Sequence, residues 1–277
     1  MTDKLKFSTL NNIDFKVIME AFYKSFDNYF VEFPKDNNLF KDRFTAAKVD
    51  FNQSVGVFDN DNLIAFIIHG LKNNTQNELV AFNIATGVVP AYRGLNLVSK
   101  MYDFIKPKLI AMGVREIGLE VITENISAIN SYLKCGFKLS KYYKCFSGKI
   151  SFVGSSIVEM KKVSKETFDW SKTEQNIYSW ENQQECIKNS AFDYYTLYQG
   201  DALNAYLIIN PSNGYIPQCD VLGGLDECWA SIFYTISKIA RQCKINNVDS
   251  HLTKKVKHLH DAGLTNHLNQ FEMKMII

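Results

Sequence analysis

The chain has 277 residues, a formal net charge of +2 at pH 7 and 46% hydrophobic residues. This length favours two domains, and the near balance of charge without a dense basic run argues against a nucleic-acid partner. No run of 18 apolar residues and no signal-type segment near the N-terminus are present, and the six cysteines lack a CxxC pair. We therefore expect a soluble cytoplasmic protein with reduced thiols and no membrane partner.

The first half begins with a strand and two helices. Lys6–Leu10 predicts a strand, Ile13–Phe26 a helix with one apolar face, and Asn37–Val49 a shorter helix. Two apolar runs follow, Ser54–Phe58 and Leu63–Leu71, with four Asp and Asn residues between them. Asp and Asn tolerate the positive φ of tight turns, so these runs predict a β-hairpin.

A strand-to-helix turn is the next feature of the chain. Glu78–Val89 is rich in β-branched and apolar residues, as in a buried strand, and Leu97–Met112 carries apolar residues at helical spacing. If the helix begins near Asn96, the N–H groups of Gly94–Val98 lie at the positive end of its dipole. Such a turn is suited to hold a phosphate or pyrophosphate.

A second strand and helix follow about thirty residues later. Glu120 falls in the strand-like run, and Asn125, Ala128 and Tyr132 come next at i, i+3 and i+7, so that they lie on one helix face. Gly136 follows as a helix stop, and Phe137 opens a further strand.

These two segments resemble the GNAT superfamily of acyl-CoA-dependent N-acyltransferases. The similarity is carried by Pro90-Ala91-Tyr92-Arg93-Gly94 and by the series Asn125, Ala128, Tyr132, Gly136 and Phe137. The resemblance implies an α+β (mixed α/β) fold with a central, mostly antiparallel twisted sheet flanked by helices. It covers about half of the chain, and we expect this domain to span residues 1–163.

Residues 164–277 predict a second, smaller and degenerate GNAT-like domain, because the element order repeats from the central hairpin onward. Ahead of its repeat we expect a strand over Ile150–Met160 and an interdomain linker over Lys161–Lys172. The elements expected after the linker are strands over 194–198, 203–209, 215–222 and 247–252, helices over 227–243 and 253–262, and an edge strand over 271–276. The second half lacks an Arg-Gly approach, and Leu259 stands where Tyr132 would be.

The resemblance implies acetyl-CoA as cosubstrate and places its binding site. The backbone of Gly87, Val88 and Val89 would meet the pantetheine arm, and Arg93, Gly94, Leu95, Asn96, Leu97 and Val98 the pyrophosphate. Asn125 would order the helix start or contact the pantetheine amides. The chain departs from the family pattern at Asn96, where glycine is usual, and at Val98, where glycine or alanine is usual.

Tyr132 is the expected catalytic residue. A phenol with a pKa of about 10 can protonate a departing thiolate as general acid; the alternative is a core aromatic whose hydroxyl bonds the backbone. The general base stays open among Glu78, Glu120 and a water chain. His69 is expected to be a hydrogen-bonded wall residue, and the histidines form no metal-ligand pattern, so no metal is expected.

The sequence thus predicts an N-acetyltransferase that moves an acetyl group from acetyl-CoA directly to a primary amine of a small molecule or peptide. A non-catalytic CoA-binding or structural protein is the alternative. A homodimer is compatible with either reading.

Overall fold

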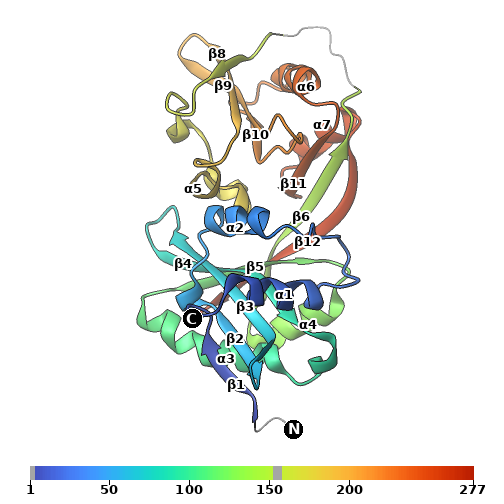
Figure 1. Ribbon diagram of the computed structural model, residues 1–277. Helices are drawn as coiled ribbons and strands as arrows, with labels where there is room; N and C mark the ends of the chain where they lie inside the picture. Colours follow the sequence, from blue (N-terminus) through green and yellow to red (C-terminus); the bar gives the residue numbers. More distant parts are fainter. Residues whose placement is uncertain (1–3, 152–157) are drawn as a thin grey trace. The chain divides into compact units, whose positions relative to one another are not determined.

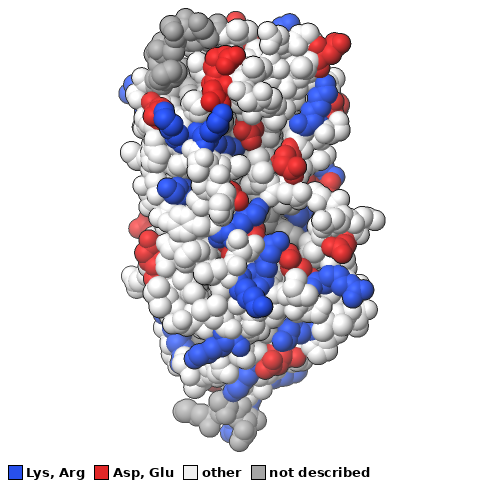
Figure 2. All heavy atoms as spheres, turned by 180° about the vertical axis from the view of Figure 1, so that it is seen from behind, with Lys and Arg blue, Asp and Glu red and all other residues white. Residues whose placement is uncertain are grey.

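The structure is a computed structural model that describes residues 4–151 and 158–277. Its contacts divide the chain into two compact units (Figure 1). The first comprises Met1–Ser140 and Glu272–Ile277, and the second comprises Lys141–Phe271. On the face drawn in Figure 2, Lys and Arg side chains are interspersed with Asp and Glu.

The first unit is built on a mostly antiparallel sheet. Five strands lie side by side in this sheet in the order in which they occur in the sequence. They are β1 (Lys6–Thr9), β2 (Val55–Asp59), β3 (Asn62–Asn73), β4 (Leu79–Val88) and β5 (Glu116–Ile122). β1 to β4 pair antiparallel, whereas β4 and β5 pair in parallel. The predicted hairpin is confirmed, and Asn60 in its turn has a φ of 52°, which Asn tolerates better than other side chains.

Helices surround this sheet. They are α1 (Phe15–Ser25), α2 (Asn37–Ala46), the short 3-10 helices η2 (Phe51–Gln53) and η3 (Pro90–Tyr92), α3 (Leu97–Ala111) and α4 (Ile126–Cys135). Asp14 and Asp36 cap α1 and α2 by accepting hydrogen bonds from backbone N–H groups of the first turn. An aromatic core that includes Phe22, Phe40 and Phe66 packs α1 and α2 onto β3.

Two long strands each begin in one unit and end in the other. β6 (Lys138–Gly148) runs from the first unit into the second, and β12 (Thr265–Ile276) runs from the second into the first. In strand order β12 lies between β5 and β6, so the prediction of an edge strand over 271–276 is wrong. Alternation of apolar residues reports which face of a strand is buried, and says nothing about its two hydrogen-bonding edges.

The second unit contains a four-stranded antiparallel sheet and the end of the larger one. Its elements are β7 (Lys161–Val163), η4 (Trp170–Lys172), η5 (Gln175–Ile177), η6 (Trp180–Asn182), α5 (Gln184–Ile187), β8 (Asp193–Gln199), β9 (Ala202–Ile209), β10 (Gln218–Val221), α6 (Cys228–Ile239), β11 (Cys243–Asp249) and α7 (Thr253–Asp261). The small sheet has the order β10-β9-β8-β7, and β11 pairs with β6.

Several predicted elements in this half are corrected. The linker expected over Lys161–Lys172 is wrong: β7 pairs with β8, and Phe168 is buried in a core of aromatic rings. The helix expected to reach Cys243 ends at Ile239, because Cys243 already opens β11. Of the strand expected over 150–160, residues 152–157 lie outside the described part, and the described ends are not strand.

The order of elements from β8 to β12 parallels that from β2 to β6, as the repeat in the sequence predicts. The two units are defined by contacts between residues and divide the chain after Ser140. They do not test a domain boundary between residues 163 and 164, which stays a prediction.

Candidate active site

β4 and β5 pair for only part of their length. Their parallel pairs run from Val80 opposite Glu116 to Asn83 opposite Leu119. β4 continues to Val88, yet no pair beyond Asn83 joins the two strands in the described chain. This stretch of β4 therefore carries backbone groups on one edge that no strand satisfies, and such groups need another partner.

The end of β4 is the place where the cofactor arm is expected. The Val89 N–H donates to the Ile64 carbonyl on β3 at 2.9 Å, so the strand alternation directs the backbone of Val88 to the opposite side. Gly87 packs against a buried ring, since a Cβ there would lie 2.4 Å from Phe66 Cζ. Gly87 thus has a packing reason to be glycine, independent of any ligand.

The turn between β4 and α3 presents free N–H groups. Within the described residues, no acceptor is found for the backbone N–H groups of 94–99. Gly94 has a φ of 81°, and a Cβ there would meet nothing within 4 Å. α3 begins directly after Asn96, so the positive end of its dipole adds to these donors. The turn has the features of an anion site.

Asn96 explains how the chain departs from the family pattern without losing the turn. It is the N-cap of α3 with φ 57° and ψ 31°, the left-handed region. Asn is the side chain that enters this region most readily after glycine. Val98 is half-buried in the first turn of α3, and its backbone N–H is one of the free donors.

Arg93 makes contacts within the protein. Its Nη2 donates to the Ser25 carbonyl at 2.9 Å and its Nε donates to the Val88 carbonyl at 3.3 Å. The side chain thus ties the end of α1 to the end of β4. A contact between Arg93 and a pyrophosphate stays a prediction.

Tyr132 lies on α4, the helix whose limits were expected. Asn125 is its N-cap, with Oδ1 accepting from the Ala128 N–H at 3.2 Å, and Gly136 ends the helix with a φ of 99°. The Tyr132 side chain is 8% exposed and its ring contacts Phe137 edge-on at 5.7 Å. Burial raises the pKa of Tyr132 to about 12, against the opposing effect of hydrogen bonds to Thr86 and Asn83.

Four residues beside Tyr132 were missed in the sequence. Asn83 donates from Nδ2 to Thr86 Oγ1 at 2.7 Å and to the Tyr102 hydroxyl at 2.8 Å. Tyr29, after α1, accepts from Asn125 Nδ2 at 3.4 Å. Asn83 and Thr86 interrupt an apolar strand, which is a usable signal, whereas Tyr29 and Tyr102 carry none.

The two carboxylates considered as general base differ in position. Glu78 precedes β4 and bonds Asn74 in the turn there. At about 3.3 Å per residue, this end of the strand is roughly 25 Å from Thr86. Glu120 directly follows Leu119, the partner of Asn83, and so stays near the site. Of the two carboxylates, only Glu120 remains a candidate.

His69 is a buried wall residue, as expected. It is fully buried on β3, and its Nδ1 lies 2.8 Å from the Gln53 carbonyl. Burial lowers the pKa of His69 to about 4, so the ring is neutral near pH 7.

The second unit has a similar strand junction that is occupied by its own side chains. Tyr215 and Lys244 form a parallel bridge that corresponds to the β4–β5 junction. Asn182 spans it: its side-chain Nδ2 donates to the Asn246 backbone carbonyl at 3.2 Å, and its backbone carbonyl accepts from Gln218 Nε2 at 2.6 Å.

Lys255 fills the same region of the second unit. Gly136 and Gly263 each follow the equivalent helix of their unit. When these two glycines are aligned, Lys255 takes the position of Ala128. It is 5% exposed, and its Nζ donates to the Cys219 carbonyl on β10 at 2.5 Å. The Cys219 carbonyl on β10 therefore has a partner within the protein.

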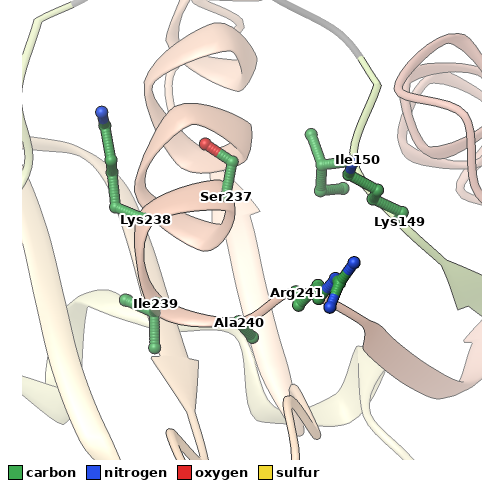
Figure 3. Close-up of a pocket in the computed structure, with 7 residues that line it drawn as sticks. All are labelled: Lys149, Ile150, Ser237, Lys238, Ile239, Ala240 and Arg241. Carbon is green, nitrogen blue, oxygen red and sulfur yellow. The ribbon is translucent and has the colours of Figure 1, made fainter.

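A shallow pocket of about 200 Å³ lies at the C-terminal end of α6 (Figure 3). Lys149, Lys238 and Arg241 contribute cationic side chains, and Ile150, Ser237, Ile239 and Ala240 complete its lining. All three cations are exposed, and none of these residues belongs to the acyl-transfer site expected from the sequence.

The described residues contain no group of three or more His, Cys, Asp and Glu side chains arranged to hold a metal ion. Among them, no helix combines the length and apolar character needed to cross a membrane.

Comparison with known proteins identifies the class of the first unit. Residues 17–137 match the model of the acetyltransferase (GNAT) family. The chain therefore contains a GNAT acetyltransferase domain, which implies acyl transfer from acyl-CoA. No curated protein matches the sequence.

Solved structures show the fold of the whole chain. A GCN5-related N-acetyltransferase from Sphaerobacter thermophilus is 11% identical, with a TM-score of 0.67 over 100% of this chain and 96% of that one. A candidate acetyltransferase from Pyrococcus horikoshii is 12% identical, with a TM-score of 0.68 over 100% and 91%. A tandem GNAT protein from the clavulanic acid biosynthesis pathway is 12% identical, with a TM-score of 0.65 over 98% of both chains. The fold is thus similar to a tandem GNAT arrangement.

Proposed function

We propose that this protein is an N-acetyltransferase that transfers an acetyl group from acetyl-CoA directly to a primary amine of a small molecule or peptide. The observation that carries this proposal is the combination of a free-donor turn at 94–99 with a buried phenol, Tyr132, beside the unpaired edge of β4. A cytoplasmic location stays a prediction from composition.

Cofactor placement follows from the free N–H groups of the turn and from the edge of β4 that pairs with no strand. The N–H groups of residues 94–98 would hold the pyrophosphate. The edge of β4 at Val88, whose carbonyl also accepts from Arg93 Nε, would face the amide groups of the pantetheine arm. Asn125 caps α4 whether or not it also contacts the pantetheine amides. Asn182 and Lys255 already occupy the matching region of the second unit, so we expect one cofactor per chain.

The reaction needs one proton donated and one removed. The amine nitrogen attacks the thioester carbonyl carbon, the C–S bond breaks, and Tyr132 protonates the departing sulfur. Glu120 or water accepts the proton that the amine loses. A phenol that is protonated at neutral pH is suited to the donor role.

A calorimetric titration with acetyl-CoA tests the binding part of the proposal. We expect saturable binding of one molecule per chain, followed by thiol release when amines are supplied. Absence of binding would favour the alternative, a structural or interaction protein; binding without thiol release from any amine would favour a CoA-binding protein.

Replacing Tyr132 tests the chemical part. We expect Tyr132→Phe to lower turnover about 100-fold, the usual contribution of a general acid, with little change in acetyl-CoA affinity. Tyr142→Phe, which removes a phenol in the second unit, is the matched control and should keep full activity. Equal turnover in Tyr132→Phe would remove the general-acid assignment.

A further inference from the structure

Two side chains directly before the turn between β4 and α3 tie it to other elements. The Tyr92 hydroxyl donates to Asp59 Oδ2, at the end of β2, at 2.7 Å. Arg93 donates from Nη2 to the Ser25 carbonyl at 2.9 Å and from Nε to the Val88 carbonyl at 3.3 Å. The turn therefore has two separate anchors, and that of Arg93 is the one that reaches α1.

The Ser25 carbonyl is the kind of group that a helix leaves without a partner. Ser25 is the last residue of α1, and the last carbonyl groups of a helix have no amide donor in a following turn. Arg93, 68 positions later in the chain, supplies that donor. Its positive charge also lies at the negative end of the helix dipole. Arg93 thus caps α1 from a distant turn.

The capped end of α1 connects β4 to α4. Ser25 is 5% exposed, and a Cβ built at Gly87 would lie 2.8 Å from Ser25 Cβ, so α1 ends directly against β4. Four residues later, the Tyr29 hydroxyl accepts from Asn125 Nδ2 at 3.4 Å. Asn125 is the N-cap of α4, the helix that carries Tyr132. The short segment after α1 therefore extends from the end of β4 to the start of α4.

The chemistry of the arginine side chain suits this place. A guanidinium presents its N–H donors in a fixed planar fork, so one side chain can bond two carbonyl groups on different elements. A lysine ammonium is a compact charge that binds phosphate well, but it does not reproduce the two fixed donor directions. A cap of α1 and a pyrophosphate ligand therefore respond differently when Arg93 is replaced by lysine.

We propose that Arg93 is a positioning residue, which caps α1 and thereby holds residues 26–29 and the start of α4 in the place that Tyr132 needs. This role differs from the pyrophosphate contact expected from the sequence, because it leaves the pyrophosphate to the backbone N–H groups of the turn. The inference rests on the proposed function, since the group that Arg93 places is the proposed proton donor.

Amide hydrogen exchange and calorimetry on the full chain test this role without turnover. Two amides report on the segment: the Phe26 N–H donates to the Phe22 carbonyl at 3.0 Å, and the Tyr29 N–H donates to the Phe26 carbonyl at 3.2 Å. We expect Arg93→Lys to speed the exchange of both about tenfold, the effect of losing a hydrogen bond to a charged group. The Kd for acetyl-CoA should stay within about threefold of the parent value, because the Tyr92 anchor and the backbone donors remain.

Turnover is measured with the amine that gives the most thiol release in the parent protein. Arg93→Lys should lower kcat about tenfold with the KM for acetyl-CoA unchanged, because the proton donor is displaced while the cofactor site is intact. A general loss of structure around the turn would raise this KM as well. Arg93→Gln, a second variant without the charge, should behave like Arg93→Lys. Arg115→Lys is the matched control, at another exposed arginine of the first unit, and should match the parent protein.

Three results would overturn the inference. The first is loss of acetyl-CoA affinity in Arg93→Gln with retention in Arg93→Lys, which would make Arg93 a pyrophosphate ligand. The second is exchange in Arg93→Lys equal to that in Arg115→Lys, and the third is an unchanged kcat despite faster exchange.

Failure of the proposed function has a different signature. Faster exchange in Arg93→Lys, in a protein that binds acetyl-CoA and transfers its acetyl group to no amine, would support the cap of α1 and reject the proposed function. The two failures are therefore distinguishable.

Discussion

Burial sets the protonation state of two side chains in the first unit in opposite chemical ways. It raises the pKa of Tyr132 to about 12 and lowers the pKa of His69 to about 4. Both groups are uncharged near pH 7, because a low-dielectric surrounding disfavours phenolate and imidazolium alike. For Tyr132 this keeps a transferable proton in place, whereas for His69 it links stability to pH.

Lowering the pH from 6.5 to 4 should therefore destabilise the protein through His69. The folded-state pKa is below the unfolded value, so the unfolded chain binds a proton first and the native state loses stability as pH falls through this window. The shift corresponds to about 3 kcal/mol at pH 4. Urea unfolding at pH 7.5 and pH 4.5 measures it in the parent protein and in His69→Asn.

His251→Asn is the control for this comparison, because that side chain is 84% exposed. The carboxylates that titrate near pH 4 are common to all three proteins and cancel in the differences. A parent protein and a His69→Asn variant that lose stability equally on acidification would contradict the role of His69.

At the scale of elements, the turn between β4 and α3 is the feature on which the proposed cofactor binding depends. Its donors are backbone groups, so side-chain substitutions affect it through charge or backbone conformation. Position 94 separates these two effects, because a Cβ there meets no neighbour.

Gly94→Asp should abolish acetyl-CoA binding, since it places a carboxylate beside the expected pyrophosphate. Gly94→Asn has the same size without the charge, and Asn tolerates the φ of 81° at this position. We expect calorimetry to show affinity within a few-fold of the parent protein for Gly94→Asn and a loss of at least about tenfold for Gly94→Asp. Equal affinities in the two variants would place the pyrophosphate elsewhere.

Local signals in the sequence were sufficient for most of the first unit. The turn residue Asn60, the helix stop Gly136 and the left-handed Asn96 all have the backbone conformations expected from their residue types. Each of these depends on interactions within a few residues. The same holds for Gly263, which ends the corresponding helix in the second unit.

What could not be predicted depends on partners distant in sequence. β7 reads as a polar linker because its three residues gain a strand partner only from β8. Tyr29 joins the site through Asn125, 96 positions away. Ile84 is an extra residue in the pairing of β4 with β3, and the bulge that it makes, which aligns Asn83 with Thr86, leaves no trace in composition.

At the scale of the whole molecule, the first unit includes residues from both ends of the described chain. Glu272–Ile277 belong to it, with the Ile277 N–H donating to the Arg115 carbonyl at 3.1 Å and Lys274 Nζ 2.9 Å from Glu116 Oε1. Met273 and Met275 are buried.

Deleting residues 272–277 should lower the stability of the first unit by about 4 kcal/mol, the burial of two methionine side chains. Unfolding in urea, with cleavage of the first unit by a protease as the readout, measures its free energy of unfolding. Ile276→Ala, at a side chain that is 76% exposed, is the control and should unfold like the parent protein. Unchanged stability of the deletion variant would show that β12 contributes little there.

The return of β12 also has a consequence for synthesis on the ribosome. Every residue of the expected acyl-transfer site has left the exit tunnel long before residues 272–277 are made. Until then the outer edge of β5 has no strand beside it and is open to pairing with other chains. Completion of the first unit thus awaits translation of the second, and a premature stop in the second half would release a chain that has the residues of the proposed acyl-transfer site but an unfinished sheet.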